Sequence, residues 1–391
     1  MDKQSLASDT DKINEVLTRG VDTLLPDKER LMRLMNEKQI TLYQGFDPSM
    51  PSIHLGNLVG VMKLRQFQKL GHKVIFLIGD FTGMIGDPSD KLAARKKLTR
   101  EEVTKNAETW KDQISNLIDF AGENPAVIRH NSEWSDDVSF KDLIEITSNF
   151  TVQQMIERDM FQTRLRENKP IYLHEFLYPV AQGYDSVAMD VDLEIGGSDQ
   201  LFNMLAGRSL MKAMKGKDKF VLGTKLLVDK EGNKAGKTTG NALFLDSTPE
   251  EFYGGVMTFP DETIMLGYEL LTEVPLEGIE EKINKDPLGQ KKQLAFEVIQ
   301  LIWGGNEAKA AKEYFEDTFQ QGNLPENVEV VKEKVLVDAV TFVTGSRTES
   351  KRLLSQRAIE VDGNVVEEQQ FKLNGGEVVK IGKKKFVRIE K

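Results

Sequence analysis

The chain has 391 residues, of which 39% are hydrophobic and 29% are charged, as is ordinary for a globular protein of two or three domains. No apolar run approaches 18 residues and the polar residues 1–12 contain no signal-peptide core, so the sequence predicts a cytoplasmic protein without a membrane span. With no cysteine and four scattered histidines, we expect neither a disulfide framework nor a zinc site.

The net charge of −10 is unevenly distributed along the chain. Residues 332–391 carry 13 Lys and Arg against 9 Asp and Glu, whereas the remaining residues carry 39 against 53. A basic tail on an acidic body is expected if only the tail and selected patches contact phosphates. A solvated basic surface without a ligand gives the same pattern, so charge alone leaves both interpretations open.

The first elements in chain order are helical. Apolar residues at helical spacing predict helix over residues 13–40. Residues 42–46 read as a buried strand, and Pro48 and Pro51 force residues 48–52 into a turn. Helical spacing then runs from Leu55 toward Gly71, and residues 74–78 form a second apolar run. Strand, helix and strand within about 40 residues predict a βαβ unit with a right-handed crossover.

The start of that second helix predicts an anion site. The first backbone N–H groups of a helix have no internal partners. His54 and Asn57 are three residues apart and share one face, and Gly56 between them lets a flat ligand approach the backbone. From these residues alone, a helix cap with one polar core histidine remains the alternative.

A second group of polar residues lies on a later helix. Residues 79–91 read as a loop whose glycines do not match a dinucleotide fingerprint. A capped helix over 99–120, a strand at 125–130 and helices over 135–170 follow. The next helix, 177–189, presents Tyr178, Gln182 and Asp185 on one face. Such a stripe is often solvated, but its apolar neighbours indicate a buried polar face.

In the rest of the chain, predicted strands and helices alternate up to about residue 240, and mainly helical segments follow. A strand at 193–195 leads into residues 196–200, followed by a helix over 201–214, a strand over 220–228, a turn at 229–233 and a Gly/Lys loop at 234–240. Only three residues separate Gly232 from Gly236, so a Walker A loop is not predicted. Helices run from Pro249 to about residue 321, and 322–326 reads as a linker. Two helices, 336–343 and 348–356, and short strands around Gly363, Gly375 and Gly382 complete the chain.

Four short stretches together carry a resemblance to a known family. The stretch His54-Leu55-Gly56-Asn57 is similar to the HIGH signature of class I aminoacyl-tRNA synthetases, with Asn57, still a neutral donor, where a second histidine is more frequent. The stretches Gly45-Phe46-Asp47-Pro48, Gly196-Gly197-Ser198-Asp199-Gln200 and Lys234-Ala235-Gly236-Lys237-Thr238 look like the bacterial tyrosyl-tRNA synthetase family. The last stretch resembles the KMSKS loop, with Ala235 in place of the usual aromatic residue or Met. The resemblance covers nearly the whole chain.

The resemblance implies an α/β fold with three parts. A Rossmann-like parallel-sheet catalytic domain would span 1–245, with an insertion at about 110–170 that forms the dimer interface in the family and a KMSKS-like loop at 234–238. A helical anticodon-side domain would span 246–325, and an S4-like α+β RNA-binding domain 332–391. The implied reaction activates L-tyrosine with ATP and transfers tyrosine to the 3′ end of tRNA(Tyr). The implied enzyme is a homodimer, and Mg²⁺ would accompany ATP, held mainly by phosphates and water.

The resemblance also assigns roles to single residues. Tyr43 and Asp185 would bind the phenol hydroxyl of tyrosine, and Asp87, Tyr178 and Gln182 its ammonium group. The ATP and adenylate site would be lined by Gly45, Asp47, Ser49, His54, Gly56, Asn57, Gly197, Asp199 and Gln200, the last also contacting tyrosine. Lys234, Lys237 and Thr238, assisted by Lys91 and Arg95, would close on the leaving pyrophosphate, although Asp90 stands where a glycine is more usual. In the tail, Arg347, Lys351, Arg352 and Arg357 would contact RNA phosphates.

Two rival functions remain at this point. Tryptophanyl-tRNA synthetases share the implied fold, but Asp185 after Gln182, together with the S4-like tail, favours tyrosine. A non-catalytic RNA-binding paralogue would use only the S4-like tail. The presence of His54, Asp185 and Lys237 argues against that second alternative.

Overall fold

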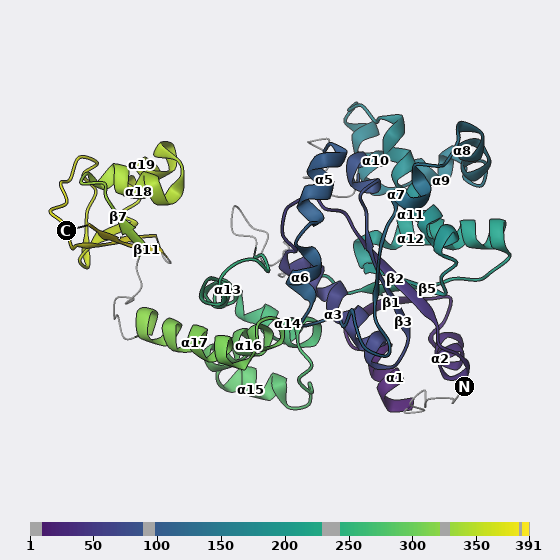
Figure 1. Cartoon of the computed structure of the whole chain (residues 1–391), viewed down its shortest axis with the longest axis horizontal. Helices are drawn as coiled ribbons and strands as arrows, with labels where there is room; N and C mark the ends of the chain where they lie inside the picture. Colours follow the sequence, from purple (N-terminus) through teal and green to yellow (C-terminus); the bar gives the residue numbers. More distant parts are fainter. Residues whose placement is uncertain (1–9, 89–97, 229–242, 321–328, 383–384, 391) are drawn as a thin grey trace. The chain divides into compact units, whose positions relative to one another are not determined.

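The computed structural model describes residues 10–88, 98–228, 243–320, 329–382 and 385–390 (Figure 1). By compactness the chain divides into residues 1–308 and residues 309–391. The predicted domain limits near 245 and 325 stay predictions. Five predicted site residues lie outside the described residues: Lys91, Arg95, Lys234, Lys237 and Thr238.

The first unit is built on a six-stranded sheet, as the α/β prediction requires (Figure 1). Its strands are β1 (Val21–Leu25), β2 (Thr41–Phe46), β3 (Lys73–Ile78), β4 (Val127–His130), β5 (Leu193–Gly197) and β6 (Phe220–Thr224), in the order β1-β6-β5-β2-β3-β4. All neighbours are parallel except β1 and β6. The chain adds β3 and β4 on one side of β2 and then β5 and β6 on the other. The strand order therefore reverses between β2 and β5, where open α/β sheets form their ligand crevice.

The predicted βαβ unit is confirmed. Strand β2, helix α3 (Leu55–Lys69) and strand β3 follow one another, and β2 and β3 pair in parallel from Thr41 with Lys73 to Phe46 with Ile78. Helix α3 buries Leu58, Val61 and Leu64 almost completely, at 0–1% exposure. A helix so packed fixes its first turn against the carboxyl end of β2.

The other helices of this unit lie before, between and after the strands. They are α1 (Thr10–Val16), α2 (Lys28–Glu37), α4 (Thr82–Ile85), α5 (Arg100–Ala107), α6 (Trp110–Ile114), α7 (Ser132–Ser135), α8 (Phe140–Thr147), α9 (Val152–Ile156), α10 (Asp159–Arg166), α11 (Leu173–Met189), α12 (Leu201–Leu210), α13 (Pro249–Val256), α14 (Ile264–Leu271), α15 (Ile279–Lys285) and α16 (Pro287–Ile302). Helix α17 (Gly305–Phe315) contains the boundary between the units. Within the described ranges, no helix has the length and apolar character needed to cross a membrane.

Some predicted elements are wrong in detail. The helix predicted over 13–40 is interrupted by β1, because Gly20 ends the first helical stretch at φ +66° and the following residues pair with β6. The helix predicted over 99–120 begins at the capping box of Thr99 and Glu102 but divides into α5 and α6. The loop predicted over 79–91 contains α4, and β6 ends at Thr224 rather than at residue 228.

The second unit has its own sheet and core. Strands β7 (Glu329–Val331), β8 (Ile359–Val361), β9 (Asn364–Val365), β10 (Val378–Ile381) and β11 (Lys385–Ile389) lie in the order β7-β11-β10-β8-β9. Helices α18 (Leu336–Thr344) and α19 (Arg347–Ser355) match the two predicted helices, whereas β7 was not predicted. Leu336, Val340, Leu354 and Val379 are fully buried in a common apolar cluster. This unit therefore has a hydrophobic core of its own.

Candidate active site

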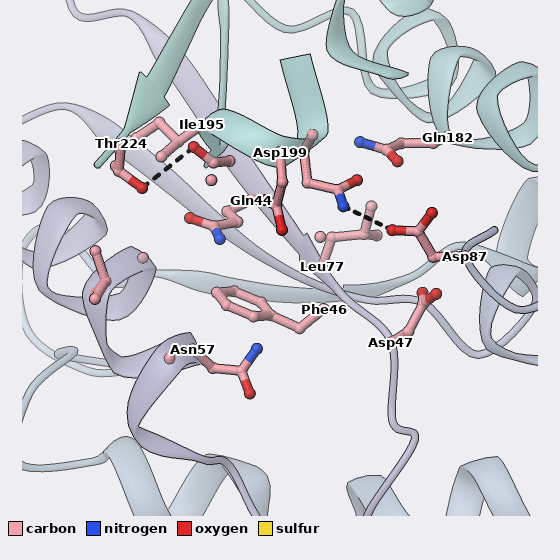
Figure 2. Close-up of a pocket in the computed structure, with 18 of the residues that line it drawn as sticks. Gln44, Phe46, Asp47, Asn57, Leu77, Asp87, Gln182, Ile195, Asp199 and Thr224 are labelled. Carbon is pink, nitrogen blue, oxygen red and sulfur yellow. Dashed lines mark hydrogen bonds between the residues drawn. The ribbon is translucent and has the colours of Figure 1, made fainter. Parts of the chain in front are cut away.

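A pocket of about 230 Å³ lies at the carboxyl ends of β2 and β5, where the strand order reverses (Figure 2). Most of the residues predicted for tyrosine and ATP line it: Gly45, Asp47, Ser49, His54, Gly56, Asn57, Asp87, Tyr178, Gln182, Asp185, Gly197, Asp199 and Gln200. In Figure 2 the side chains of Asn57 and Asp87 lie at opposite sides of the view. The structure thus brings together segments that are up to about 150 residues apart in sequence, as expected for a crevice at a sheet's carboxyl edge.

The start of α3 is both a helix cap and a wall of the pocket. His54 is the N-cap, and its Nδ1 accepts a hydrogen bond from the Asn57 backbone N–H at 3.2 Å. Asn57 Oδ1 accepts in return from the His54 backbone N–H at 3.4 Å. Because Nδ1 is an acceptor, the neutral imidazole carries its proton on Nε2 and is a donor there. Capping and ligand contact are therefore compatible, and the same two side chains can serve both.

Asp47 is held at the end of β2 by two hydroxyl groups. Tyr178 Oη donates to its Oδ2 at 2.8 Å, and Thr82 Oγ1 donates to its Oδ1 at 2.7 Å. A Cβ on Gly79 would lie 2.1 Å from Asp47 Oδ1 and 2.5 Å from Thr82 Oγ1, so only glycine leaves room for this arrangement. Burial, reinforced by the Asp47 carboxylate, raises the pKa of the Tyr178 hydroxyl well above its ordinary value, so this group remains a donor.

Asp185 is the most buried acidic group of the pocket lining, at 2% exposure. Its Oδ1 accepts from Trp134 Nε1 at 2.9 Å, and its Oδ2 from Asn131 Nδ2 at 3.3 Å. Burial raises the pKa of Asp185 well above its ordinary range, while these two donors act in the opposite direction. Sequence reasoning missed Asn131 and Trp134. Asn131 directly follows the predicted strand at 125–130, and that position at the sheet's carboxyl edge was the available signal.

Asp87 and Gln200 are joined across the pocket (Figure 2). Gln200 Nε2 donates to Asp87 Oδ2 at 2.6 Å, and its Oε1 accepts from Asn203 Nδ2 at 2.9 Å. Gln200 ends a short 3-10 turn, Ser198–Gln200, directly after β5. This hydrogen bond therefore connects the loop after α4 with the segment after β5 at the pocket.

Tyr43, predicted to bind the phenol of tyrosine, is not among the residues that line the pocket. It is fully buried beside Ile75, Leu77 and Val191, and its hydroxyl lies 2.9 Å from Ser186 Oγ. Burial, followed by the charge of Glu194, raises the pKa of this hydroxyl well above its ordinary value. Side chains alternate along a strand, so Tyr43 lies on the opposite face from Gln44, which packs on Gly60 of α3. The role predicted for the Tyr43 hydroxyl toward substrate stays a prediction.

The basic residues predicted to contact RNA are exposed on the second unit. Arg347, Lys351 and Arg352 belong to α19, and Arg357 follows its end. Arg347 pairs with Asp338 at 3.0 Å, Arg352 with Glu349 at 2.6 Å and Arg357 with Glu367 at 3.1 Å. Exposed pairs of this kind contribute little to stability. A phosphate could therefore replace the carboxylate at little cost.

Comparison with known proteins gives concordant results. The family model "tRNA synthetases class I (W and Y)" matches residues 35–320. The chain is 40% identical to a tyrosine--tRNA ligase of Thermotoga maritima, with 96% of each chain covered. It is 38% identical to the corresponding enzyme of Oleidesulfovibrio alaskensis, with 97% of this chain and 99% of that protein covered.

Solved structures share the fold. A C-terminally truncated mitochondrial tyrosyl-tRNA synthetase of Coccidioides posadasii aligns with a TM-score of 0.64 at 24% identity, covering 77% of this chain and 91% of that chain. A tyrosyl-tRNA synthetase of Archaeoglobus fulgidus, solved in complex with L-tyrosine, aligns with a TM-score of 0.61 at 21% identity, covering 78% and 99%. At these identities the likeness concerns the fold.

Proposed function

The chain belongs to the tyrosyl-tRNA synthetases of the class I aminoacyl-tRNA synthetase family, and from that membership we propose how its pocket carries out tyrosine--tRNA ligation. In the first step L-tyrosine and ATP give tyrosyl-adenylate and pyrophosphate. In the second step the 3′ end of tRNA(Tyr) takes the tyrosyl group and AMP leaves. The observation that carries the proposal is one pocket lined both by the polar stripe of α11 and by the first turn of α3.

The α11 side of the pocket is proposed to hold tyrosine. Asp185, already fixed by two donors, would accept the phenol O–H. Asp87, Tyr178 and Gln182 would surround the ammonium group, since all three line the same pocket as Asp185, and Tyr178 and Gln182 belong to its helix α11. A buried site that pairs a hydroxyl leaves its acceptor unpaired when a substrate without that hydroxyl binds.

The α3 side is proposed to hold ATP. The substrate carboxylate is ionised at neutral pH, so one of its oxygens attacks the α-phosphorus directly while the bond to pyrophosphate breaks. Negative charge then collects on phosphate oxygens, where the His54 imidazole and the Asn57 carboxamide can donate. Positioning and charge stabilisation carry this step, because no proton has to be removed from the nucleophile.

The loop lysines Lys234 and Lys237 are proposed to bind the leaving pyrophosphate, with Lys91 and Arg95 assisting. All four lie outside the described residues, and their roles rest on the family motif. Among the described residues no three acidic or histidine side chains converge on a metal position. Mg²⁺ would accompany ATP, held mainly by phosphate oxygens and water, and would neutralise charge on the pyrophosphate.

Two further parts of the proposal concern the whole enzyme. The second unit would be an S4-like module that contacts tRNA phosphates, supported by its separate core and its exposed basic helix α19.

A homodimer would form through the insertion. Large exposed hydrophobic residues concentrate, among the described residues, in the insertion (Phe140, Ile144, Val152 and Leu165) and directly after it (Tyr172 and Leu173). A concentration of this kind indicates an interaction surface rather than scattered exposure.

ATP–pyrophosphate exchange with each of the twenty amino acids tests the activation step. We expect exchange to depend on tyrosine and ATP, and charging of tRNA(Tyr) to follow. A comparable kcat/KM with tryptophan would favour the tryptophanyl alternative. Binding of RNA without any exchange would favour the non-catalytic paralogue.

A further inference from the structure

A buried ion pair lies next to the pocket without lining it. Glu194 of β5 and Lys219, which precedes β6, are 1% and 0% exposed. Lys219 Nζ donates to Glu194 Oε2 and also to Ser186 Oγ, at 2.8 Å in the second case. Removing two charges from water costs several kcal/mol per ion, and a buried pair is often no more stabilising than apolar residues of the same size. The pair therefore calls for an explanation other than stability.

The pair contacts the proposed tyrosine site directly through Gln182, and it is linked to Tyr43 through Ser186. Gln182 Nε2 donates to Glu194 Oε1 at 3.0 Å. Tyr43 Oη lies 2.9 Å from Ser186 Oγ, which also contacts Lys219. Every oxygen of the Glu194 carboxylate is thus engaged by a donor from Gln182 or from Lys219.

This contact decides which end of the Gln182 carboxamide faces the ligand. A carboxylate paired with an ammonium group only accepts hydrogen bonds, so it takes the amide N–H₂ and not the amide oxygen. Gln182 Oε1 is buried and has no hydrogen-bond partner among the described residues, although Gln182 lines the pocket. Figure 2 shows this carboxamide at the edge of the pocket near Asp87.

We propose that Glu194, paired with Lys219, is a positioning residue that turns the Gln182 oxygen toward the ammonium group of the amino-acid substrate. The inference rests on the proposed function, because it assigns the ammonium subsite of that same pocket. Without Glu194 the carboxamide could rotate by half a turn, and its N–H₂ would then face a cationic group that it cannot bind.

The surrounding backbone is shaped to admit the pair. A Cβ on Gly207 of α12 would lie 2.6 Å from Lys219 Nζ and 2.9 Å from Ser186 Oγ. A Cβ on Gly183 of α11 would lie 3.0 Å from the Gly207 backbone nitrogen. Glycine at both positions lets α11 and α12 approach closely and leaves the space that the Lys219 ammonium occupies.

The variant Glu194→Gln tests the proposal, because a neutral carboxamide can donate as well as accept and no longer fixes Gln182. In pyrophosphate exchange we expect KM for L-tyrosine to rise about 10- to 100-fold, the loss of a charge-assisted hydrogen bond, with KM for ATP unchanged. The inhibition constant of 3-(4-hydroxyphenyl)propanoate, which is tyrosine without its amino group, should stay within about twofold, since only the ammonium contact is lost.

Two further variants separate positioning from structure. The double variant Glu194→Gln/Lys219→Met removes both charges together and should show the same tyrosine-specific effect even if the single variant fails to fold. Glu175 lies on α11, the helix of Gln182, but outside the pocket, and it forms an ion pair with Arg164 of α10. Glu175→Gln breaks that pair and should leave the binding of tyrosine and of 3-(4-hydroxyphenyl)propanoate unaffected.

Equal weakening of tyrosine and of the analogue without the amino group, or no change in either, would overturn the inference. Absence of tyrosine-dependent exchange in the unaltered enzyme would instead overturn the proposed function, so the two failures are distinguishable.

Discussion

Asp185 is the residue on which the choice of amino acid is expected to depend. In Asp185→Asn the acceptor loses its charge and presents N–H₂ as well as oxygen, so we expect kcat/KM for tyrosine to fall about 10²-fold. Discrimination against phenylalanine should shrink as well. Tyrosyl-tRNA synthetases are themselves the standard example of this discrimination, with a known preference for tyrosine over phenylalanine of about 10⁵.

Pyrophosphate exchange with tyrosine and phenylalanine measures both effects. Asp190→Asn, which alters an exposed carboxylate at the end of the same helix, is the matched control and should behave as the unaltered enzyme. Retention of full tyrosine selectivity in Asp185→Asn would show that another group recognises the phenol hydroxyl.

His72 couples stability to pH at a site without a catalytic role. It is 1% exposed, its Nδ1 faces the Ile40 backbone N–H at 3.4 Å, and burial lowers its pKa to about 4. Between pH 6.5 and pH 4 the unfolded chain therefore binds a proton that the folded chain does not. The free energy of unfolding should fall by about 3 kcal/mol as pH is lowered through this window, with none of this loss above pH 6.5.

The variant His72→Gln keeps an acceptor for the Ile40 N–H but does not titrate. Urea unfolding at pH 4 and pH 7 should show a smaller pH dependence for this variant than for the unaltered protein, by about 3 kcal/mol. His174→Gln serves as the control on a less buried histidine. Identical pH dependence in all three proteins would contradict the assignment.

At the scale of elements, we propose that one side chain in the first turn of α3, His54, contributes to both stability and catalysis. His54→Ala removes the N-cap acceptor, which should cost about 1 kcal/mol of stability, and a donor to the reacting phosphate, which should lower kcat about 10²- to 10³-fold. His54→Asn restores a good N-cap but not the imidazole.

We therefore expect thermal unfolding of His54→Asn to match the unaltered protein while its kcat stays low. Recovery of kcat together with stability in His54→Asn would mean that the histidine acts only as a cap.

The elements that could be predicted from the sequence are those whose local pattern and tertiary role agree. Strand β2, the proline turn and α3 show this agreement, because the spacing of apolar residues changes where the chain passes from strand to helix. Strand β1 was missed because Val16, Val21 and Leu24 also fit a helical spacing, and its actual partner, β6, is remote in sequence. Most of the polar pocket was predicted because its residues belong to recognisable motifs. Trp134, Glu194 and Lys219 carry no local signal that tells a buried network from a polar surface.

At the scale of the molecule, the second unit should be dispensable for amino-acid activation. Its core is separate, so a protein lacking residues 332–391 should retain pyrophosphate exchange while KM for tRNA in charging rises. Because phosphate contacts release counterions, the unaltered enzyme should also lose tRNA affinity more steeply with salt than the truncated one.

Replacing Arg347, Lys351, Arg352 and Arg357 together with alanine should reproduce the tRNA effect without truncation. Lys372→Ala on the same unit is the control. A truncated protein that is folded by circular dichroism but inactive in exchange would show that the tail supports the catalytic unit. Unchanged charging at physiological salt would show that the tail is not an RNA module.

Self-association is expected to depend on the exposed residues of the insertion and of the start of α11. Leu173 and Phe140 are 83% and 79% exposed in the single chain. An aspartate at Leu173 would have to be buried in the proposed interface, so Leu173→Asp should shift the protein from dimer to monomer in light scattering at micromolar concentration. Leu288→Asp, at another exposed leucine on α16, should not. An unaltered protein that is monomeric and fully active would contradict the proposed dimer.

The pairing of β1 with β6 has a consequence for how the protein is made. Leu25 ends β1, yet Phe220, where its partner strand begins, is synthesised about 195 residues later, which at 5–20 residues per second is roughly 10 to 40 s of translation. The hydrogen-bond partners of Arg19 are synthesised later still, because its guanidinium binds the carbonyl groups of Tyr268 and Thr272 around the end of α14. During that interval the nascent chain presents an unpaired strand at its N-terminal end. We therefore expect the edge of the sheet to close only after most of the first unit has left the ribosome, which makes this segment the natural place for a chaperone to bind.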